Sequence, residues 1–240
     1  MPEPIALDNA AAMARLRAGL EARGMADVAP GPVADGPSPD EPGHPEYHRR
    51  RRAEWALKRW ETATPPRYRR ADATLPGVQA WADAVAVDPT EAGSLLLTGT
   101  TGTGKTHEAY GALRRIAAAG STHPYEIRAL TAADMNGLLR VNGSPRGVEE
   151  ELRRLCRIPL LLLDDLGSAK ATEWTEETTY RLVNERYNAC KPTLYTSNLP
   201  AKSDDGRDLA SVLGERIVSR LSEDTRVVAM VGADRRRGAA

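Results

Sequence analysis

The chain has 240 residues, 41% of them hydrophobic, which is enough to bury one sizeable core but too few for two large domains. Its 33 basic residues balance its 33 acidic ones, so no global charge draws it to nucleic acid or to a membrane, and only local patches can do so. The chain has only two cysteines, without zinc-ligand spacing, which excludes a disulfide framework. It has no signal-peptide pattern and no apolar run of roughly twenty residues, which excludes export and a membrane span. These features predict a cytoplasmic protein.

The first 90 residues are predicted to form helices around an extended linker. Residues 1–24 indicate an N-terminal helix, with Asp8 as its candidate cap and Gly24 as its stop. Residues 25–47 are dense in proline and glycine, which is typical of a linker. Residues 48–90 form a basic helical segment that prolines interrupt.

The stretch HRRRRAEWALKRW, which begins at residue 48, has two interpretations. In one, its arginines contact a nucleic-acid backbone while its tryptophans stack on bases. In the other, Trp55, Leu57 and Trp60 pack on the domain that follows, and the arginines are solvated. Packing is the favoured interpretation for the tryptophans, whereas the sequence does not decide for the arginines.

Residues 91–232 alternate apolar strands with helices, and residues 233–240 are expected to form a flexible tail. The expected strands are 94–99, 125–131, 158–167, 191–198 and 225–232. The expected helices between and after them are 105–120, 132–140, 148–157, 172–189 and 208–223. This alternation predicts an α/β fold in three layers (α/β/α), with a five-stranded parallel sheet covered by helices on both faces.

A glycine-rich loop, GTTGTGKT, follows the first strand and opens a helix, in the pattern G-x-x-x-x-G-K-[ST]. Its glycines let successive N–H groups face a phosphate, and the helix adds its positive end. We expect Lys105 to bridge the β- and γ-phosphates of ATP and the Thr106 hydroxyl to hold Mg²⁺. The residues assigned to the nucleotide are Gly99, Thr100, Thr101, Gly102, Thr103, Gly104, Lys105 and Thr106. The alternative is a glycine-rich turn with an accidental lysine, which the flanking strand and helix disfavour.

Polar side chains end two later strands. Asp164 is expected to reach the magnesium ion and Asp165 to orient the attacking water, unless both acids merely cap the next loop. Asn198 can hold that water, because an amide both donates and accepts hydrogen bonds; the alternative is an ordinary turn before Pro200.

Two arginines lie beside the apolar stripe expected in helix 208–223. Arg216 and Arg220 are four residues apart, so they lie side by side on that helix. They can enter the nucleotide site of a neighbouring copy, or form surface salt bridges with Glu215 or Glu223. The stripe itself consists of Leu209, Val212, Leu213, Ile217 and Leu221.

Four segments together carry a family resemblance: GTTGTGKT, LLLLDDLGSAKATEWTEE, YTSNL and LGERIVSRL. They resemble the AAA+ ATPases of the DnaC/IstB group, P-loop NTPases that comprise bacterial and phage helicase loaders and transposition ATPases. The resemblance covers residues 93–231 and implies that Asn198 is sensor 1 and that Arg220, supported by Arg216, is an arginine finger acting in trans. The chain departs from longer members in lacking a lid helix with a sensor 2 arginine, and the cysteines of zinc-bearing loaders.

The resemblance implies Mg²⁺-dependent ATP hydrolysis, self-assembly into a ring or spiral, and loading of a replicative hexameric helicase. Residues 1–24 are then the candidate helicase-docking helix, and Arg140, Arg146, Arg153 and Arg154 are candidate contacts to single-stranded DNA, although a solvated helix face explains them equally well. The alternative is an IstB-like transposition ATPase that binds target DNA and recruits a transposase. A switch that binds ATP without hydrolysing it is disfavoured, because both acids and both arginines are present.

Overall fold

The computed structural model describes residues 9–24, 36–168, 172–203, 206 and 208–234. The chain divides into two compact units, residues 1–44 and 45–240. The first contains α1 (Asn9–Glu21), which confirms the N-terminal helix, whereas its predicted cap Asp8 lies outside the described residues. Residues 25–35 of the predicted linker and residues 235–240 of the predicted C-terminal tail also lie outside them. None of the described helices has both the length and the apolar character needed to cross a membrane.

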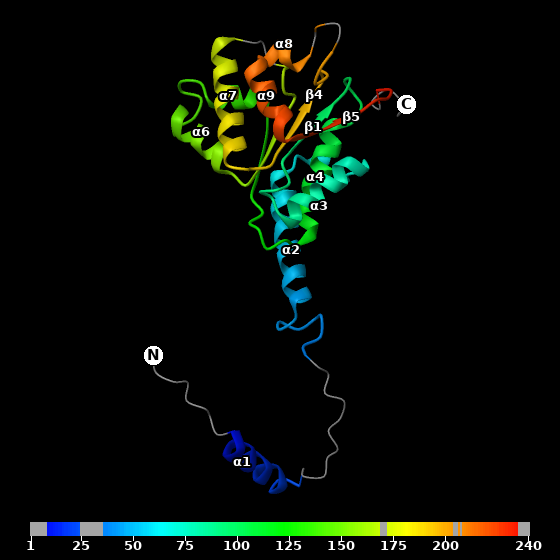
Figure 1. Ribbon diagram of the computed structural model, residues 1–240, viewed down its shortest axis with the longest axis vertical. Helices are drawn as coiled ribbons and strands as arrows, with labels where there is room; N and C mark the ends of the chain where they lie inside the picture. The colour runs from blue at the N-terminus through cyan, green and yellow to red at the C-terminus, as the bar shows by residue number, and fades with distance from the viewer. Residues whose placement is uncertain (1–8, 25–35, 169–171, 204–205, 207, 235–240) are drawn as a thin grey trace. The chain divides into compact units, whose positions relative to one another are not determined.

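The second unit is built on a five-stranded sheet in which every pair of neighbouring strands is parallel, as predicted (Figure 1). The strands are β1 (Ser94–Thr98), β2 (Ile127–Thr131), β3 (Leu160–Asp164), β4 (Thr193–Ser197) and β5 (Thr225–Ala229). Their order across the sheet is β2-β3-β4-β1-β5. Strand β4 therefore lies between β1, which leads into the glycine-rich loop, and β3, which leads into the acid pair Asp164 and Asp165.

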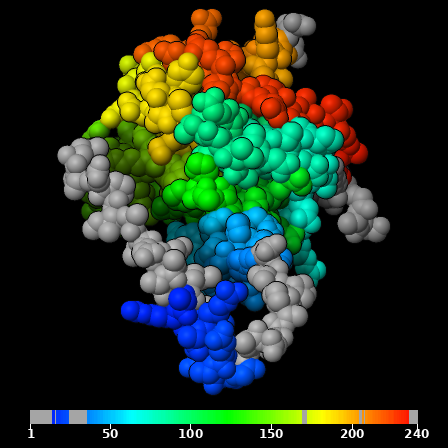
Figure 2. All heavy atoms as spheres, turned by 60° about the horizontal axis from the view of Figure 1, so that its bottom comes forward, coloured from blue at the N-terminus to red at the C-terminus, as the bar shows by residue number. Residues whose placement is uncertain are grey.

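Helices cover both faces of this sheet, because alternate strand residues point to opposite sides. Leu95 and Leu97 belong to one core, whereas Leu96 between them belongs to the other. The first core is covered by α2 (Pro45–Ala63), α3 (Pro76–Val87) and α4 (Lys105–Ala119). The second is covered by α5 (Ala132–Leu138), α6 (Val148–Arg157), α7 (Glu173–Asn188), α8 (Leu209–Leu213) and α9 (Glu215–Asp224). Figure 2 shows the surface on which α3 lies beside β5. The predicted three layers are confirmed.

Helix α2 begins at Pro45, so the last three residues of the predicted linker are helical, and it buries one of its two tryptophans. Trp60 is buried and its indole nitrogen donates to the Tyr110 carbonyl at 3.1 Å, and Leu57 packs partly against the same core. Trp55 is 53% exposed, so the prediction that it packs was wrong. Residues five apart on a helix point about 140° apart, so Trp55 and Trp60 cannot both face α4.

The predicted helix 208–223 is two helices, α8 and α9, separated at Gly214. Gly214 has φ 85° and ψ 149°, outside the helical region, and a Cβ there would lie 2.4 Å from a carboxylate oxygen of Glu176. A single helix was therefore the wrong prediction. The apolar stripe nevertheless continues across the break, because Leu209, Leu213, Ile217 and Leu221 are all buried.

Candidate functional site

The glycine-rich loop connects the end of β1 to the start of α4. Gly99 must lack a side chain, because a Cβ there would lie 2.2 Å from the Met230 carbonyl oxygen. Gly104 caps α4 with φ 96°, in the left-handed region that favours glycine. The loop thus turns sharply and presents the N-terminus of α4, with its partial positive charge, at the carboxyl edge of the sheet.

Lys105 is folded back into this loop. Its side chain is buried, and its ammonium group donates to the carbonyl oxygens of Gly99 and Thr100, both at 2.8 Å. The Thr103 hydroxyl donates to the same Thr100 carbonyl at 2.9 Å. A buried cation beside a helix N-terminus is an environment that favours an anion such as a phosphate group.

Asp164, the last residue of β3, lies beside this loop. The Thr106 hydroxyl donates to its two carboxylate oxygens at 3.1 and 3.2 Å, and the Thr196 hydroxyl donates to Oδ1 at 2.5 Å. Burial raises the pKa of Asp164, and the hydrogen bonds from Thr196 and Thr106 oppose that rise. The two predicted magnesium ligands are therefore in contact with each other.

The residues at this position fit a magnesium ion. Mg²⁺ prefers oxygen ligands and is usually held by one or two side chains together with water and substrate phosphates. The hydroxyl of Thr106 and the carboxylate of Asp164 are such ligands, and they meet at the start of the helix that the phosphate loop opens. A cation there would also stabilise the charged form of a carboxylate that burial disfavours.

Asp165 and Asn198 meet at the same edge of the sheet. The Asn198 amide nitrogen donates to Asp165 Oδ1 at 3.0 Å. Asp165 has φ 58°, a left-handed conformation that is uncommon for a residue other than glycine. Its backbone N–H donates to the Thr196 hydroxyl at 3.0 Å. The two residues predicted to hold the attacking water thus contact each other directly.

The structure adds two residues that the sequence analysis missed. Thr196 on β4 contacts both acids, although it looks like any other residue of an apolar strand. Glu108 in the first turn of α4 is buried and accepts hydrogen bonds from the Thr74 hydroxyl and from the N–H groups of Thr74 and Leu75. It ties the segment before α3 to the helix that opens at the phosphate loop, a role that no spacing pattern signals.

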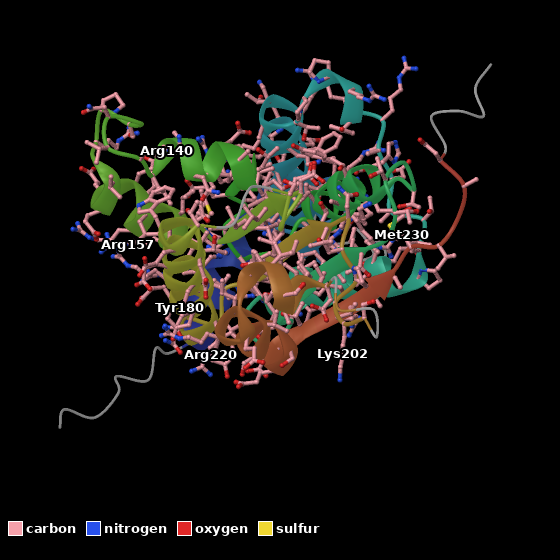
Figure 3. All side chains as sticks on the ribbon, turned by 90° about the horizontal axis from the view of Figure 1, so that it is seen from above. Arg140, Arg157, Tyr180, Lys202, Arg220 and Met230 are labelled. Atoms are coloured by element: carbon pink, nitrogen blue, oxygen red, sulfur yellow. The ribbon has the colours of Figure 1, made fainter. Side chains whose placement is uncertain are left out.

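Arg220 lies far from the phosphate loop of its own chain. Arg220 lines a small cavity with Ser94 and Thr225 at the starts of β1 and β5, whereas the loop follows the end of β1. Four residues of strand separate those ends by about 13 Å. In Figure 3, Arg220 lies on the opposite side of the second unit from Met230, which contacts the loop. The chain therefore does not bring its own Arg220 to its phosphate loop, whereas Arg216 lies near the start of α9, beside Trp174 and Tyr180 of α7.

Both arginines stack on tyrosines of α7. The guanidinium carbon of Arg216 lies 4.1 Å from the ring centre of Tyr180, and that of Arg220 lies 5.1 Å from the ring centre of Tyr187. Arg220 also pairs with Glu223 at 3.4 Å, one of the two salt bridges considered from the sequence. Such contacts fix the direction in which the two guanidinium groups leave α9.

The arginines of α2 are held by local partners. Glu46 pairs with Arg49 and Arg50, and Glu54 pairs with Arg51. Arg52 donates to the Gly120 and Ser121 carbonyls at 2.9 and 3.1 Å. These contacts favour the solvated interpretation of the basic stretch over contact with nucleic acid.

The four arginines considered as DNA contacts lie on and around α5 and α6 and are exposed. Arg146 and Arg154 both pair with the buried carboxylate of Glu151, at 3.9 and 3.7 Å. Figure 3 shows Arg140 and Arg157 reaching outward on the same side of the unit. The structure therefore leaves both the DNA-contact and the solvated interpretation open for this group.

Comparison with known proteins gives consistent matches. Residues 79–239 match the family model described as IstB-like ATP binding protein. YdaV of Escherichia coli is 28% identical over 126 residues, covering 52% of this chain and 47% of YdaV. An insertion-sequence protein of Mycobacterium tuberculosis that is named as ATP-binding is 27% identical over 163 residues, covering 68% of this chain and 63% of that protein.

A solved structure, of the DnaC helicase loader, has 26% identity and a TM-score of 0.57, and the match covers 70% of this chain and 100% of that one. The chain spans roughly half the length of the curated relatives that it matches, between 39% and 63%. The match to the family model includes the phosphate loop, both acids, Asn198 and the two arginines of α9.

Proposed function

Because the chain belongs to the IstB-like ATP-binding protein family, a group of AAA+ proteins similar to DnaC, we propose that it hydrolyses ATP to load a replicative hexameric helicase. The observation that carries the hydrolytic part is the meeting of Thr106, Asp164, Asp165 and Asn198 beside the phosphate loop. This arrangement combines an anion site, a seat for a magnesium ion and a polar pair for a water molecule.

In the proposed reaction, water attacks the γ-phosphate in line with the leaving oxygen. Asp165 accepts a hydrogen bond from that water and polarises it, while the Asn198 amide holds Asp165 and the water in place. Lys105 exchanges its hydrogen bonds to the Gly99 and Thr100 carbonyls for phosphate oxygens. Thr106 and Asp164 would hold Mg²⁺, which would supply charge neutralisation for the phosphate oxygens.

A neighbouring copy completes the site in this proposal. Arg220, with Arg216 beside it, stabilises the charge that develops on the phosphate during the reaction. The position of Arg220 at the start of β1, the end of that strand away from the phosphate loop, supports action in trans. The proposal therefore includes assembly of copies into a ring or spiral and weak hydrolysis by isolated monomers.

The loader role rests on similarity to the DnaC helicase loader, whose solved structure matches over its full length. In this role residues 1–24 dock on the helicase through the tether of residues 25–47, and the exposed arginines around α6 contact single-stranded DNA. A tether raises the local concentration of a second contact without fixing its geometry. We assign residues 48–90 to a helical segment and residues 91–232 to the AAA+ domain.

The second candidate function is an ATPase of transposition that binds target DNA and recruits a transposase. The relative in a Mycobacterium tuberculosis insertion sequence favours it. Both candidates use the same nucleotide-site residues, so only the partner distinguishes them. Binding of the full chain to a purified hexameric helicase, lost on removal of residues 1–24, supports loading; binding to a transposase instead supports transposition.

The hydrolytic proposal is tested by measuring ATP turnover of the parent protein and of Asp165→Asn over a range of protein concentrations, with and without single-stranded DNA. We expect Mg²⁺-dependent turnover that rises with protein concentration and falls about 100-fold or more in the variant. Turnover that stays undetectable at every concentration, with nucleotide still bound, would make the protein an ATP-binding switch instead.

A further inference from the structure

We infer that Thr196 is a positioning residue for ATP hydrolysis, because one hydroxyl group holds both acids of the site. The Thr196 hydroxyl orients the carboxylate of Asp164 and stabilises the turn that contains Asp165. This inference rests on the proposed ATPase function. Thr196 acts through the two acids that its hydroxyl contacts, Asp164 and Asp165.

The hydroxyl of Thr196 uses its donor and an acceptor at the same time. Thr196 is fully buried on β4, between β3 and β1. Its hydroxyl donates to Asp164 Oδ1 at 2.5 Å and accepts from the Asp165 backbone N–H at 3.0 Å. A hydroxyl provides one donor and two acceptor sites, so both bonds are satisfied together. A valine would have the same shape and make neither.

The first of these bonds limits how the Asp164 carboxylate can rotate. Oδ1 accepts from both threonines, whereas among the described residues only Thr106 donates to Oδ2. Because the Thr196 hydroxyl on β4 donates to Oδ1, the carboxylate of Asp164 keeps its orientation toward the phosphate loop. A ligand whose outer hydrogen bonds are removed loses metal affinity or activity by about 10- to 100-fold in known metal sites.

The second bond supports a strained turn. The left-handed φ of 58° at Asp165 is unfavourable for a residue with a side chain, so surrounding contacts must maintain it. Thr196 supplies two of them: its hydroxyl accepts from Asp165 N–H, and its carbonyl accepts from Leu166 N–H at 2.7 Å. The Ser197 hydroxyl adds a third by donating to the Leu166 carbonyl at 2.7 Å. The turn places Asp165 against Asn198.

The chain offers a matched control for removal of a buried hydroxyl. Thr64, just after α2, is also buried, and its hydroxyl has no hydrogen-bond partner among the described residues. Thr64→Val therefore makes the same chemical change without breaking a bond. Thr196→Val and Thr196→Ala remove the hydroxyl, whereas Thr196→Ser keeps it and removes only a methyl group.

The experiment measures metal binding separately from catalysis on the full-length protein. Mn²⁺ replaces Mg²⁺ as the probe, and its binding is followed by electron paramagnetic resonance with a non-hydrolysable ATP analogue present. For Thr196→Val we expect Mn²⁺ affinity and turnover each reduced about 10- to 100-fold. Fluorescent ADP binding in excess chelator should stay within about twofold of the parent, because the phosphate loop is intact. Thr196→Ser should recover most of both losses, and Thr64→Val should match the parent.

Thermal unfolding of each variant separates a folding defect from a positioning defect. If Thr196→Val does not fold, the comparison of Thr196→Ser with Thr196→Ala tests the same hydroxyl at nearly constant volume. Parental Mn²⁺ affinity and turnover in a folded variant without the hydroxyl would overturn the inference and leave the ATPase proposal intact. A parent protein without turnover would instead reject the ATPase proposal, while Mn²⁺ binding would still test the role of Thr196.

Discussion

Lys105 is the residue on which we expect nucleotide binding to depend most directly. Its side chain is buried inside the phosphate loop, where its ammonium group donates to the Gly99 and Thr100 carbonyls at 2.8 Å. We expect Lys105→Ala to weaken ATP binding about 10-fold or more and to reduce turnover about 100-fold, because the loop loses its only full positive charge. Fluorescent nucleotide titration and steady-state hydrolysis measure the two effects. Lys58→Ala, an exposed lysine on α2, is the control, and equal losses in both variants would contradict this role.

Arg186 on α7 is a buried arginine with a structural role. It is 1% exposed, and burial lowers its pKa to about 10, so it remains charged at neutral pH. Its guanidinium donates to the Thr193 hydroxyl at 2.7 Å and to several backbone carbonyls between 2.8 and 3.4 Å, those of Leu155, Cys156, Ile158 and Pro192. It therefore fastens α7 to the segments that lead into β3 and β4.

We expect Arg186→Met to lower the free energy of unfolding by about 3 kcal/mol or more, because several buried carbonyls lose their donor. Urea unfolding measures this as a lower midpoint with an unchanged slope. Arg181→Met on the same helix is the matched control: its exposed pair with Glu149 contributes about 0–1 kcal/mol. Similar midpoints for the two variants would contradict a structural role for Arg186.

At the scale of single residues, the sequence predicted the site wherever position along a strand decides it. Asp164 ends an apolar strand, Asp165 and Asn198 directly follow apolar strands, and parallel strands bring their carboxyl ends to one edge. Thr196, Glu108 and Arg186 were missed for the opposite reason. Which buried polar group finds a partner depends on side chains that are distant in sequence, and no spacing pattern records that.

At the scale of elements, the segment after β5 covers part of the phosphate loop. The Met230 N–H donates to the Thr98 carbonyl at 2.7 Å, which extends the sheet past β5. Asp234 follows, with Oδ1 only 1.9 Å from where a Cβ on Gly102 would stand. A carboxylate therefore lies against the loop that we propose binds phosphates, and an incoming nucleotide must displace it or tolerate its negative charge.

We expect Asp234→Ser to raise ATP affinity several-fold, because it removes a negative charge that competes with phosphate for the loop. The difference should shrink at high ionic strength, since salt screens the charge of the partly exposed Asp234 carboxylate. Titration with fluorescent ATP at low and high salt measures both effects. Glu150→Gln removes an exposed acid on α6 and should leave the affinity unchanged. Unchanged or weaker binding by Asp234→Ser would show that its carboxylate does not oppose the nucleotide.

The elements also show where patterns stop being informative. Hydrophobic periodicity predicted every strand of the sheet and all but one of the expected helices as single elements. It could not predict the break between α8 and α9, because the buried positions keep a helical spacing across Gly214. The break follows from the backbone at Gly214 and from the side chain of Glu176 beside it, and the latter comes from a different helix.

At the scale of the whole second unit, the two parts of the proposed site are at opposite ends of one sheet. The phosphate loop follows the carboxyl end of β1, and Arg220 lies where β1 begins. The sequence predicted both parts but not the strand order β2-β3-β4-β1-β5, which depends on contacts between distant segments. The separation has a functional consequence: each copy can offer a nucleotide site at one end and an arginine at the other.

Mixing two inactive variants tests this arrangement. Arg220→Ala keeps an intact acid pair but supplies no arginine, and Asp165→Asn supplies the arginine but has a defective site. We expect each variant alone to be inactive and an equal mixture to regain up to about a quarter of parental turnover. In such a mixture, about one head-to-tail contact in four joins the intact acid pair of an Arg220→Ala copy to the Arg220 of an Asp165→Asn copy. Hydrolysis is measured at a protein concentration at which the parent is assembled.

The control is a mixture of the Arg220→Ala variant with the double variant that carries both Arg220→Ala and Asp165→Asn. No copy in this mixture has an arginine at residue 220, so it should stay inactive. If the arginine acted within its own chain, each copy in the first mixture would still lack one half of its site and turnover would not recover. If Arg220→Ala alone hydrolysed ATP at the parental rate, the stacking on Tyr187 and the pair with Glu223 would be its whole role.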